Sequence, residues 1–238
     1  MPASLLIVQM GRPPEDILHH FGDQSEWFRQ ALDGLGITTQ TVHPEAGDAL
    51  PDVQQVAGAI ITGSLSMVTD RADWSERTAV WARDMMAADR ALLGVCYGHQ
   101  LMAHALGGMV DYHPLGREVG FHQVALAAAA KNDDFFADMP DQFGAYLTHE
   151  QTVLVPPPGA TVLARSDHDA HQILRYGPKA LSVQFHPEFT APLMTAFIQR
   201  RAELFTSEGR DVAAMLSGMG PTLQSRRLLH AFVALAAA

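Results

Sequence analysis

The amino-acid sequence predicts an α/β fold in which helices cover a mostly parallel central sheet. In the first half of the chain, short apolar runs alternate with longer amphipathic stretches, a pattern typical of βα units. In the second half, short strand-like runs are separated by Gly, Pro and Asp turns, which indicates antiparallel additions to the sheet. We therefore expect a sheet whose two halves differ in strand direction.

The first half supplies the predicted central strands. Its short apolar runs are Leu5–Gln9, Ile37–Val42, Gly58–Thr62 and Ala91–Cys96. Helices are predicted between them at Ser25–Leu35 and Asp73–Asp89. In the second helix, the apolar residues Trp74, Val80, Trp81 and Met85 recur at spacings that predict one apolar face. The first half is therefore predicted to be a run of βα units.

The second half is predicted to contain short strands and then helices. The strands are Val110–Pro114, Val119–Leu126, Phe143–Val155, Thr161–Ala164, Gln172–Tyr176 and Ala180–Phe185. A helix is predicted at Thr190–Leu204, and the break Gly218-Met219-Gly220-Pro221 precedes a last helix that contains Leu228, Leu229, Phe232, Val233 and Leu235. Because no linker or repeat divides the chain, we expect a single domain spanning residues 1–238, with residues 209–238 as a C-terminal helical extension.

Composition narrows the function classes. A chain of 238 residues with 47% hydrophobic side chains can bury one large core, and its net charge of −10 favours small-molecule chemistry over nucleic-acid binding. The apolar run Leu5–Val8 lacks a preceding basic region and is cut short by Gly11–Asp16, so we expect neither a signal peptide nor a membrane span. A single cysteine excludes an internal disulfide, and we expect a reducing cytoplasmic location.

That single cysteine lies in a motif typical of a nucleophile. An apolar strand leads into the turn Gly94-Val95-Cys96-Tyr97-Gly98, and the helical pattern Leu101–Leu106 follows. The flanking glycines allow a sharp turn, and the N–H groups that begin the helix favour a thiolate at Cys96. Gln100 shares a helical face with Cys96, so its amide can reach a substrate held at the sulfur. The alternative role for Cys96 is that of a small buried hydrophobe.

A candidate base lies in the segment Gln184-Phe185-His186-Pro187-Glu188. When a thiolate attacks an amide, the departing nitrogen needs a proton, which His186 can donate. Pro187 favours an extended backbone at His186, and residues two apart in an extended chain face the same side, so Glu188 projects beside the imidazole. Taken alone, the tripeptide His-Pro-Glu favours a strand end that carries a surface carboxylate over a catalytic pair.

Together, the two motifs resemble the paired signature of class I glutamine amidotransferases, such as the amidotransferase portion of GMP synthetase. The similarity in strand and helix order covers roughly the first two hundred residues, a domain-sized stretch. The resemblance implies a flavodoxin-like three-layer sandwich with helices on both faces of the sheet. It also implies a glutaminase reaction through a glutamyl thioester on Cys96, with His186 as the base and Glu188 holding the imidazole.

The resemblance extends to groups that bind the substrate. The tetrahedral oxyanion of such a reaction needs preorganised donors, and the candidates are the N–H groups of Tyr97 and Gly63. Many family members carry Gly-Gly-Pro where this chain has Thr62-Gly63-Ser64. Thr148 and His149 are similar to the Ser/Thr-His stretch whose main chain helps to hold the amino-acid end of glutamine. Residues 116–120 are predicted either to cover the pocket as a loop or to form a plain hairpin turn.

Neither a metal nor another cofactor is expected. The cluster Asp167-His168-Asp169-Ala170-His171 offers nitrogen and oxygen ligands, but it lies between two predicted strands, where Asp-rich turns are common. No second ligand cluster of recognisable spacing accompanies it. The sequence also lacks a Gly-x-x-x-x-Gly-Lys loop and a Gly-x-Gly-x-x-Gly fingerprint, which disfavours a nucleotide-binding enzyme.

Three functions fit these observations. The first is a glutaminase or amidotransferase that converts glutamine to glutamate and ammonia for a separate synthetase subunit. The second is a free-standing γ-glutamyl hydrolase or peptidase that uses the same Cys-His-Glu triad on a γ-glutamyl conjugate. The third is a non-enzymatic interaction or redox-sensing protein, against which the intact Cys96, His186 and Glu188 argue. The expected partners are glutamine or another γ-glutamyl compound, and a synthetase subunit or a second copy of the chain.

Overall fold

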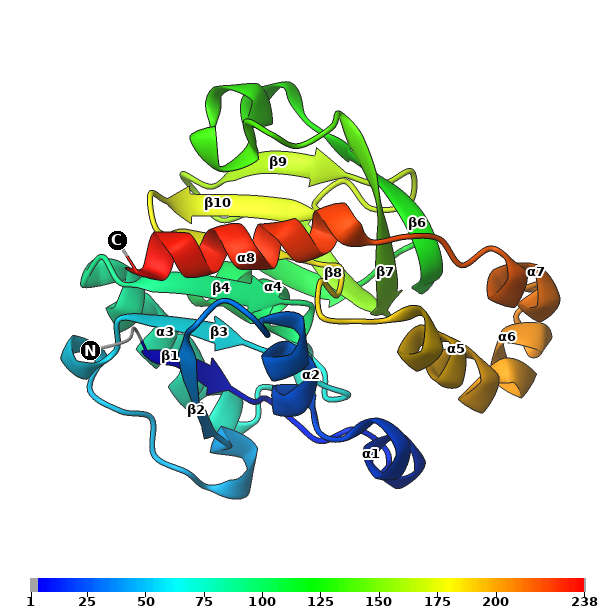
Figure 1. Ribbon diagram of the computed structural model, residues 1–238, viewed down its shortest axis with the longest axis horizontal. Coiled ribbons are helices and arrows are strands. Elements are labelled where there is room, and N and C mark those ends of the chain that lie inside the picture. Colours follow the sequence, from blue (N-terminus) through cyan, green and yellow to red (C-terminus); the bar gives the residue numbers. More distant parts are fainter. Residues whose placement is uncertain (1–3, 238) are drawn as a thin grey trace.

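The computed structural model describes residues 4–237 and shows a nine-stranded mixed sheet with helices on both faces (Figure 1). Residues 1–3 and 238, which the predicted single domain includes, lie outside the described residues. The strand order is β2-β1-β3-β4-β11-β10-β9-β6-β7. These strands are β1 (Ser4–Val8), β2 (Thr38–Val42), β3 (Gly58–Ile61), β4 (Ala91–Val95), β6 (Glu118–Leu126), β7 (Gln142–His149), β9 (Thr161–Arg165), β10 (Ile173–Gly177) and β11 (Ala180–Val183).

The mode of strand pairing changes once along the sheet, from parallel to antiparallel. The neighbours from β2 to β11 pair in parallel, whereas β10, β9, β6 and β7 add antiparallel pairs. The prediction of a parallel first half with antiparallel additions is thereby confirmed. The boundary lies at β11, which is parallel to β4 on one side and antiparallel to β10 on the other.

Two helical layers bury the sheet. The helices α2 (Gln24–Ala31) and α8 (Leu223–Ala237) contribute to the core on one face, and α3 (Asp73–Ala87) and α4 (Tyr97–Ala105) to the core on the other. Along β1, Leu5 and Ile7 belong to the first core, whereas Leu6 and Val8 belong to the second, as the two-residue period of a strand requires. In the predicted C-terminal extension, Phe232 of α8 is fully buried, so this helix completes a layer of the sandwich.

One predicted strand is divided in the structure. The run Phe143–Val155 is predicted as a single strand, but β7 ends at His149 and β8 (Gln151–Val155) begins after a bend at Glu150. β8 leaves the main sheet and pairs with β5 (Met109–Tyr112) in a separate two-stranded antiparallel sheet. The single-strand prediction is wrong because no glycine or proline marks the corner at Glu150.

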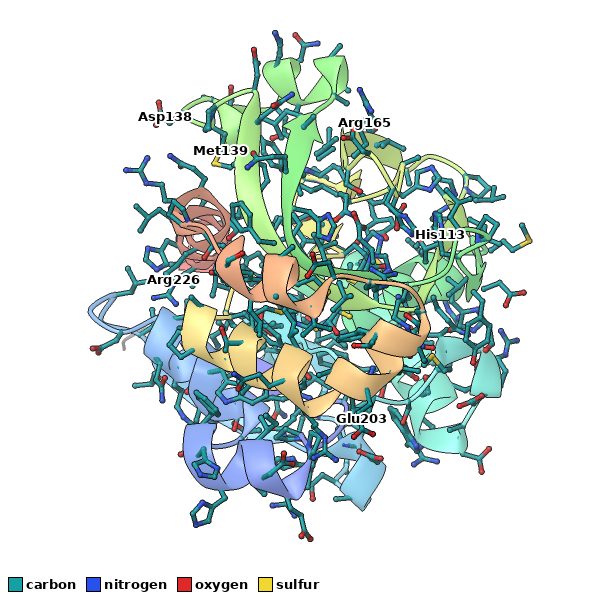
Figure 2. All side chains as sticks on the ribbon, turned by 90° about the vertical axis from the view of Figure 1, so that its right-hand side faces the viewer. His113, Asp138, Met139, Arg165, Glu203 and Arg226 are labelled. Atoms are coloured by element: carbon teal, nitrogen blue, oxygen red, sulfur yellow. The ribbon has the colours of Figure 1, made fainter. Side chains whose placement is uncertain are left out.

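Short helices cover the carboxyl end of the parallel strands. The unpredicted helix α1 (Glu15–Phe21) lies there, and the predicted helix Thr190–Leu204 is divided into α5 (Ala191–Arg200) and α6 (Ala202–Ser207), followed by α7 (Val212–Ser217). Figure 2 looks onto this end of the molecule, with α5, α6 and α7 in front of the sheet and Glu203 marking α6. Within residues 4–237, no helix has the length and apolar character needed to cross a membrane.

Candidate active site

The candidate site lies where neighbouring parallel strands end. Val95 of β4 pairs in register with Val183 of β11, and β3 lies on the other side of β4. Because parallel strands end at the same edge of a sheet, the residues that follow them, Gly63, Cys96 and His186, come together. A Cβ built on Gly63 would lie 3.0 Å from His186 Cε1 and 3.7 Å from Cys96 Cβ. A glycine at position 63 therefore leaves room for the imidazole.

Cys96 occupies a sharp strand-to-helix turn. Its backbone has φ 52° and ψ −100°, a positive φ that residues with side chains rarely adopt. Cβ atoms at the flanking glycines would collide with main chain: one on Gly94 would lie 2.5 Å from Gly98 O, and one on Gly98 would lie 2.3 Å from Ile61 O. Both glycines are thus required for this turn, which exposes 6% of Cys96 and places it at the start of α4.

His186 and Glu188 form a buried pair. His186 Nδ1 is 2.8 Å from Glu188 Oε1, so the ring donates this hydrogen bond to the carboxylate. The other ring nitrogen, Nε2, has no hydrogen-bond partner among the described residues. Phe189 stacks on the imidazole at a centroid distance of 4.1 Å, and the His186 N–H donates to Tyr146 O. The pair therefore fixes the ring and leaves Nε2 available.

The electrostatic environment keeps His186 protonated. Burial by itself lowers the pKa of His186, but the charges of Glu188 and Cys96 outweigh burial and raise the pKa to about 10. An imidazolium beside a cysteine stabilises the thiolate form of that cysteine. The arrangement consequently places a protonated imidazole beside the cysteine of the pocket.

Two backbone N–H groups are candidates for an oxyanion hole. Tyr97 is the first residue of α4, so its N–H has no partner within the helix. Neither this N–H nor that of Gly63 donates to another group within the described chain. The Tyr97 phenol bonds Ser75 Oγ at 2.6 Å, and burial raises the pKa of Tyr97 to about 12. Tyr97 can therefore offer its main chain to a ligand while its neutral ring packs in the core.

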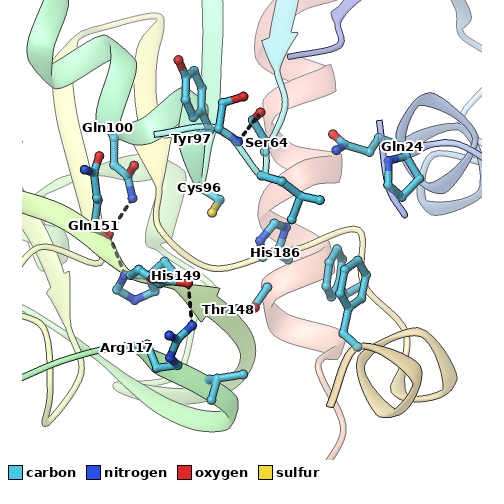
Figure 3. Close-up of a pocket in the computed structure, with 18 of the residues that line it drawn as sticks. Gln24, Ser64, Cys96, Tyr97, Gln100, Arg117, Thr148, His149, Gln151 and His186 are labelled. Carbon is cyan, nitrogen blue, oxygen red and sulfur yellow. Dashed lines mark hydrogen bonds and ion pairs between the residues drawn. The ribbon is translucent and has the colours of Figure 1, made fainter. Parts of the chain in front are cut away.

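The Gln100 side chain lines the pocket and is also hydrogen-bonded to other residues of the protein. Its Nε2 donates to Gln151 O at 2.6 Å and to Gln184 Oε1 at 3.1 Å. Both amide hydrogens are thus used, which leaves Oε1 as the group that a ligand could bond. Figure 3 shows Gln100 and His149 converging on Gln151 through dashed hydrogen bonds.

His149 takes part in a buried charge network that the sequence motifs did not predict. Its Nδ1 is 2.9 Å from Gln151 O, and its Nε2 is 3.0 Å from Glu118 Oε2. Glu118 also accepts hydrogen bonds from Ser166 Oγ and Gln172 Nε2. Because both neighbours of the imidazole are acceptors, both ring nitrogens are positioned to donate to them. Its ring is fully engaged, and only its main chain is left for a substrate.

The groups around Glu118 favour its ionised form. Burial raises the pKa of Glu118, but the hydrogen bonds and the positive charge of His149 outweigh burial and lower the pKa below its usual value. Glu118 begins β6 and pairs in register with His149 of β7. Residues 116–120 thus do not form a plain hairpin turn: Arg117 lines the pocket, and Glu118 anchors the strand beneath it.

All predicted site residues line one pocket. They are Gly63, Cys96, Tyr97, Gln100, Thr148, His149, His186 and Glu188. The same pocket is lined by residues that sequence reasoning missed, among them Gln24, Trp27, Phe197, Arg201 and Phe205. The missed residues belong to α2, α5, α6 and the link between the last two. No local motif marks them, because they meet the pocket only through packing of the short helices.

An ion network borders the pocket. Arg117 bonds both Glu150 and Glu208, and Arg201 lies 3.6 Å from Glu150. This network joins the bend between β7 and β8 to the segment after α6. It places charged groups of both signs beside the pocket.

Only one group of potential metal ligands lies near the pocket within residues 4–237. Glu118, His149 and Asp169 place ligand atoms within 4.8 Å of one another. Asp169 already accepts hydrogen bonds from Thr152 Oγ1 and from the His171 N–H, and the other two residues bond each other. Hydrogen bonds therefore account for this cluster.

The fold and the pocket together define an α/β protein with a cysteine opposite a His–Glu pair at the carboxyl edge of its sheet. The sequence model of the family described as glutamine amidotransferase class-I matches residues 20–202. The chain therefore belongs to the class I glutamine amidotransferase family.

Relatives and solved structures agree with this assignment. The chain is 28% identical over 155 residues to γ-glutamyl peptidase 5 of Arabidopsis thaliana, which covers 64% of this chain and 62% of that protein. It is 28% identical over 173 residues to a glutamine-hydrolysing subunit of GMP synthase from Archaeoglobus fulgidus, covering 72% and 87%. A glutamine amidotransferase structure from Thermotoga maritima superposes over 100% of both chains with a TM-score of 0.77 at 19% identity. The structural likeness confirms the predicted flavodoxin-like fold.

Proposed function

We propose that the protein hydrolyses the side-chain amide of glutamine, or the same bond in another γ-glutamyl compound, through a thioester on Cys96. The observation that carries the proposal is the meeting of Cys96, at a strained strand-to-helix turn, with the His186–Glu188 pair in one pocket. The relatives support the proposal, because they include a γ-glutamyl peptidase and glutamine-hydrolysing GMP synthases.

In the first half-reaction, the Cys96 thiolate attacks the γ-carbonyl carbon of the substrate. The carbonyl oxygen becomes an oxyanion, which the N–H groups of Gly63 and Tyr97 stabilise. The His186 imidazolium donates its Nε2 proton to the amide nitrogen, the C–N bond breaks, and ammonia or an amine departs. The products of this step are a γ-glutamyl thioester and a neutral imidazole that remains bonded to Glu188 through Nδ1.

In the second half-reaction, water replaces the departed nitrogen. Neutral His186 takes a proton from this water at Nε2, and the resulting hydroxide attacks the thioester carbonyl. The C–S bond breaks, the γ-carboxylic acid of glutamate leaves, and the thiolate–imidazolium pair is restored. Through both steps the main chain of Thr148 and His149 and the Gln100 carbonyl hold the amino-acid end of the substrate.

The proposal is tested by measuring glutamate release from glutamine and from γ-glutamyl amides. We expect the parent protein to release glutamate. The Cys96→Ser variant should lose at least about a thousandfold in kcat/KM, because the serine hydroxyl is a far weaker nucleophile than a thiolate. An unchanged thermal unfolding midpoint would show that the variant is folded. Comparable activity in parent and variant would overturn the mechanism.

A partner and a location follow from the same proposal. The relatives from Archaeoglobus fulgidus and Methanopyrus kandleri are each one subunit of a glutamine-hydrolysing GMP synthase. By analogy, the partner proposed for this chain is a separate synthetase subunit that consumes the released ammonia. The chemistry requires a reduced sulfur at Cys96, which a reducing compartment such as the cytoplasm maintains.

A further inference from the structure

The pocket has two sides with different tasks in the proposed reaction. In Figure 3, Gln100, Gln151 and His149 lie on one side of Cys96, whereas His186 and Gln24 lie on the other. His186 delivers a proton to the departing nitrogen, so any group carried by that nitrogen must lie on the His186 side. Glutamine has no such group, because its nitrogen leaves as ammonia. The residues that line the His186 side therefore indicate what kind of leaving group the pocket accepts.

The His186 side is lined by aromatic rings. Trp27 of α2 packs edge-to-face on Phe189 and Phe197 at centroid distances of 5.6 Å and 6.1 Å, and Phe189 stacks on Phe197 at 5.4 Å. Phe189 also stacks on His186, so this cluster contacts the imidazole that protonates the leaving nitrogen. All four side chains line the pocket, as does Leu65, which is 48% exposed. Ammonia gains nothing from such a surface, whereas an apolar amine would bury area against it.

Gln24 adds a polar group to this apolar side. It is 8% exposed, it lines the pocket, and it begins α2 one turn before Trp27. Within residues 4–237, its side-chain amide forms no hydrogen bond, although the neighbouring Asp23 carboxylate is bonded to Gln9 and to the Gln24 N–H. The amide oxygen and nitrogen of Gln24 are not among the fully buried unpartnered atoms, so they face the open pocket, where a bound molecule would replace water as their partner. Gln24 is thus positioned to bond a polar group of a bound molecule.

We infer that the preferred substrate is an N-substituted γ-glutamyl amide whose amine portion is apolar and carries a polar group that bonds Gln24. This inference rests on the proposed function and selects the substrate class for the same site. The reaction is balanced as before: the C–N bond breaks, the His186 proton goes to the nitrogen, and the product is a primary amine R–NH2 in place of ammonia.

The first test compares glutamine, γ-glutamyl methylamide and γ-glutamyl phenethylamide. The two alkylamines have similar basicity, so a difference in kcat/KM between their amides reports on the pocket and not on the leaving group. We expect the phenethylamide to exceed the methylamide by about tenfold or more, the range that apolar pocket contacts give. If the protein turns over glutamine but kcat/KM for the phenethylamide is equal to or lower than that for the methylamide, this inference is overturned and the proposed function stands. Absence of turnover for all three would overturn the proposed function itself.

The second test assigns the role of Gln24. The probes are γ-glutamyl phenethylamide and γ-glutamyl phenylalaninamide, which differ by one carboxamide. In Gln24→Met, we expect the ratio of kcat/KM for the phenylalaninamide to that for the phenethylamide to fall about fivefold, the effect of one neutral hydrogen bond. Taking this ratio within each variant cancels the difference in amine basicity. Gln30→Met, on the exposed face of the same helix, should retain the parent ratio. An unchanged ratio in Gln24→Met would overturn the assignment of Gln24.

Discussion

The two sides of the candidate site are held in place by different forces. Gly63, Cys96 and His186 follow parallel strands, and tight backbone contacts fix their positions. His149 and Glu118 belong to antiparallel strands, and a buried charge pair fixes theirs. The first side depends on glycines at particular positions in short motifs, and the second on charges that only the fold brings together. Sequence motifs therefore predict the first side with its geometry, whereas on the second side they indicate His149 but not its pairing with Glu118.

The charge-dependent side should be the more sensitive to a single substitution. Glu118→Gln keeps the shape of the side chain but removes the buried carboxylate that bonds His149 Nε2 at 3.0 Å. Removing one partner of a buried pair typically costs about 3–5 kcal/mol, and we expect the free energy of unfolding in urea titrations to fall by about that amount. Asp141→Asn is the matched control, because Asp141 pairs with Lys131 at the surface and is 82% exposed.

The pH dependence of stability should change in the same variant. The folded pKa of Glu118 is lower than its unfolded value of about 4.3, so the unfolded chain binds more protons near that pH. The stabilisation by Glu118 is present above the unfolded pKa and is lost as the pH falls through the lower folded pKa. Glu118→Gln should flatten this acid limb. A stability–pH curve parallel to that of the parent would contradict the buried carboxylate.

The side formed by Gly63, Cys96 and His186, which tight backbone contacts hold in place, can be disturbed without changing any charge. A methyl group at Gly98 would lie 2.3 Å from Ile61 O, so main chain must shift at the turn that holds Cys96. We expect Gly98→Ala to lower the free energy of unfolding by about 2–3 kcal/mol and to reduce kcat. Gly177→Ala is the control, since nothing lies within 4 Å of a Cβ there and the change should be near neutral. Equal effects at the two glycines would show that the turn tolerates a side chain.

Local patterns were sufficient to predict most of the fold. The helix Asp73–Ala87 and the strands before Cys96 follow from apolar spacing and Gly turns within a few residues. The corner at Glu150 was missed because β7 turns into β8 without a local signal, and the pairing with β5 is long-range. α1 was missed although a signal existed: Glu15 and Asp16 lie in its first turn and His19 and His20 in its last, as the helix dipole favours.

The candidate site likewise contains residues that local sequence patterns could predict and residues that they could not. Cys96, His186 and Glu188 could be predicted because each motif contains its own geometric reason, the tight turn or the two-residue alternation. Glu118 could not be assigned a role, because its partners His149 and Gln172 lie 31 and 54 residues away in the chain. Gln24 and the aromatic residues were missed for the same reason, since helix packing alone brings them to the pocket.

The smallest expected effect concerns the coupling of Glu188 to His186. In the proposed mechanism a protonated His186 serves the leaving nitrogen, so kcat/KM should hold below the His186 pKa of about 10 and fall above it. Glu188→Gln removes the charge that contributes most to raising this pKa, so the alkaline limb should move to lower pH. At a fixed pH on that limb, kcat/KM should fall about tenfold for every pH unit by which the limb moves. Glu76→Gln is the control, because Glu76 bonds His104 at 3.1 Å outside the pocket and should leave the limb in place. An alkaline limb unmoved by Glu188→Gln would mean that Glu188 acts by packing, and not through the charge of the imidazole.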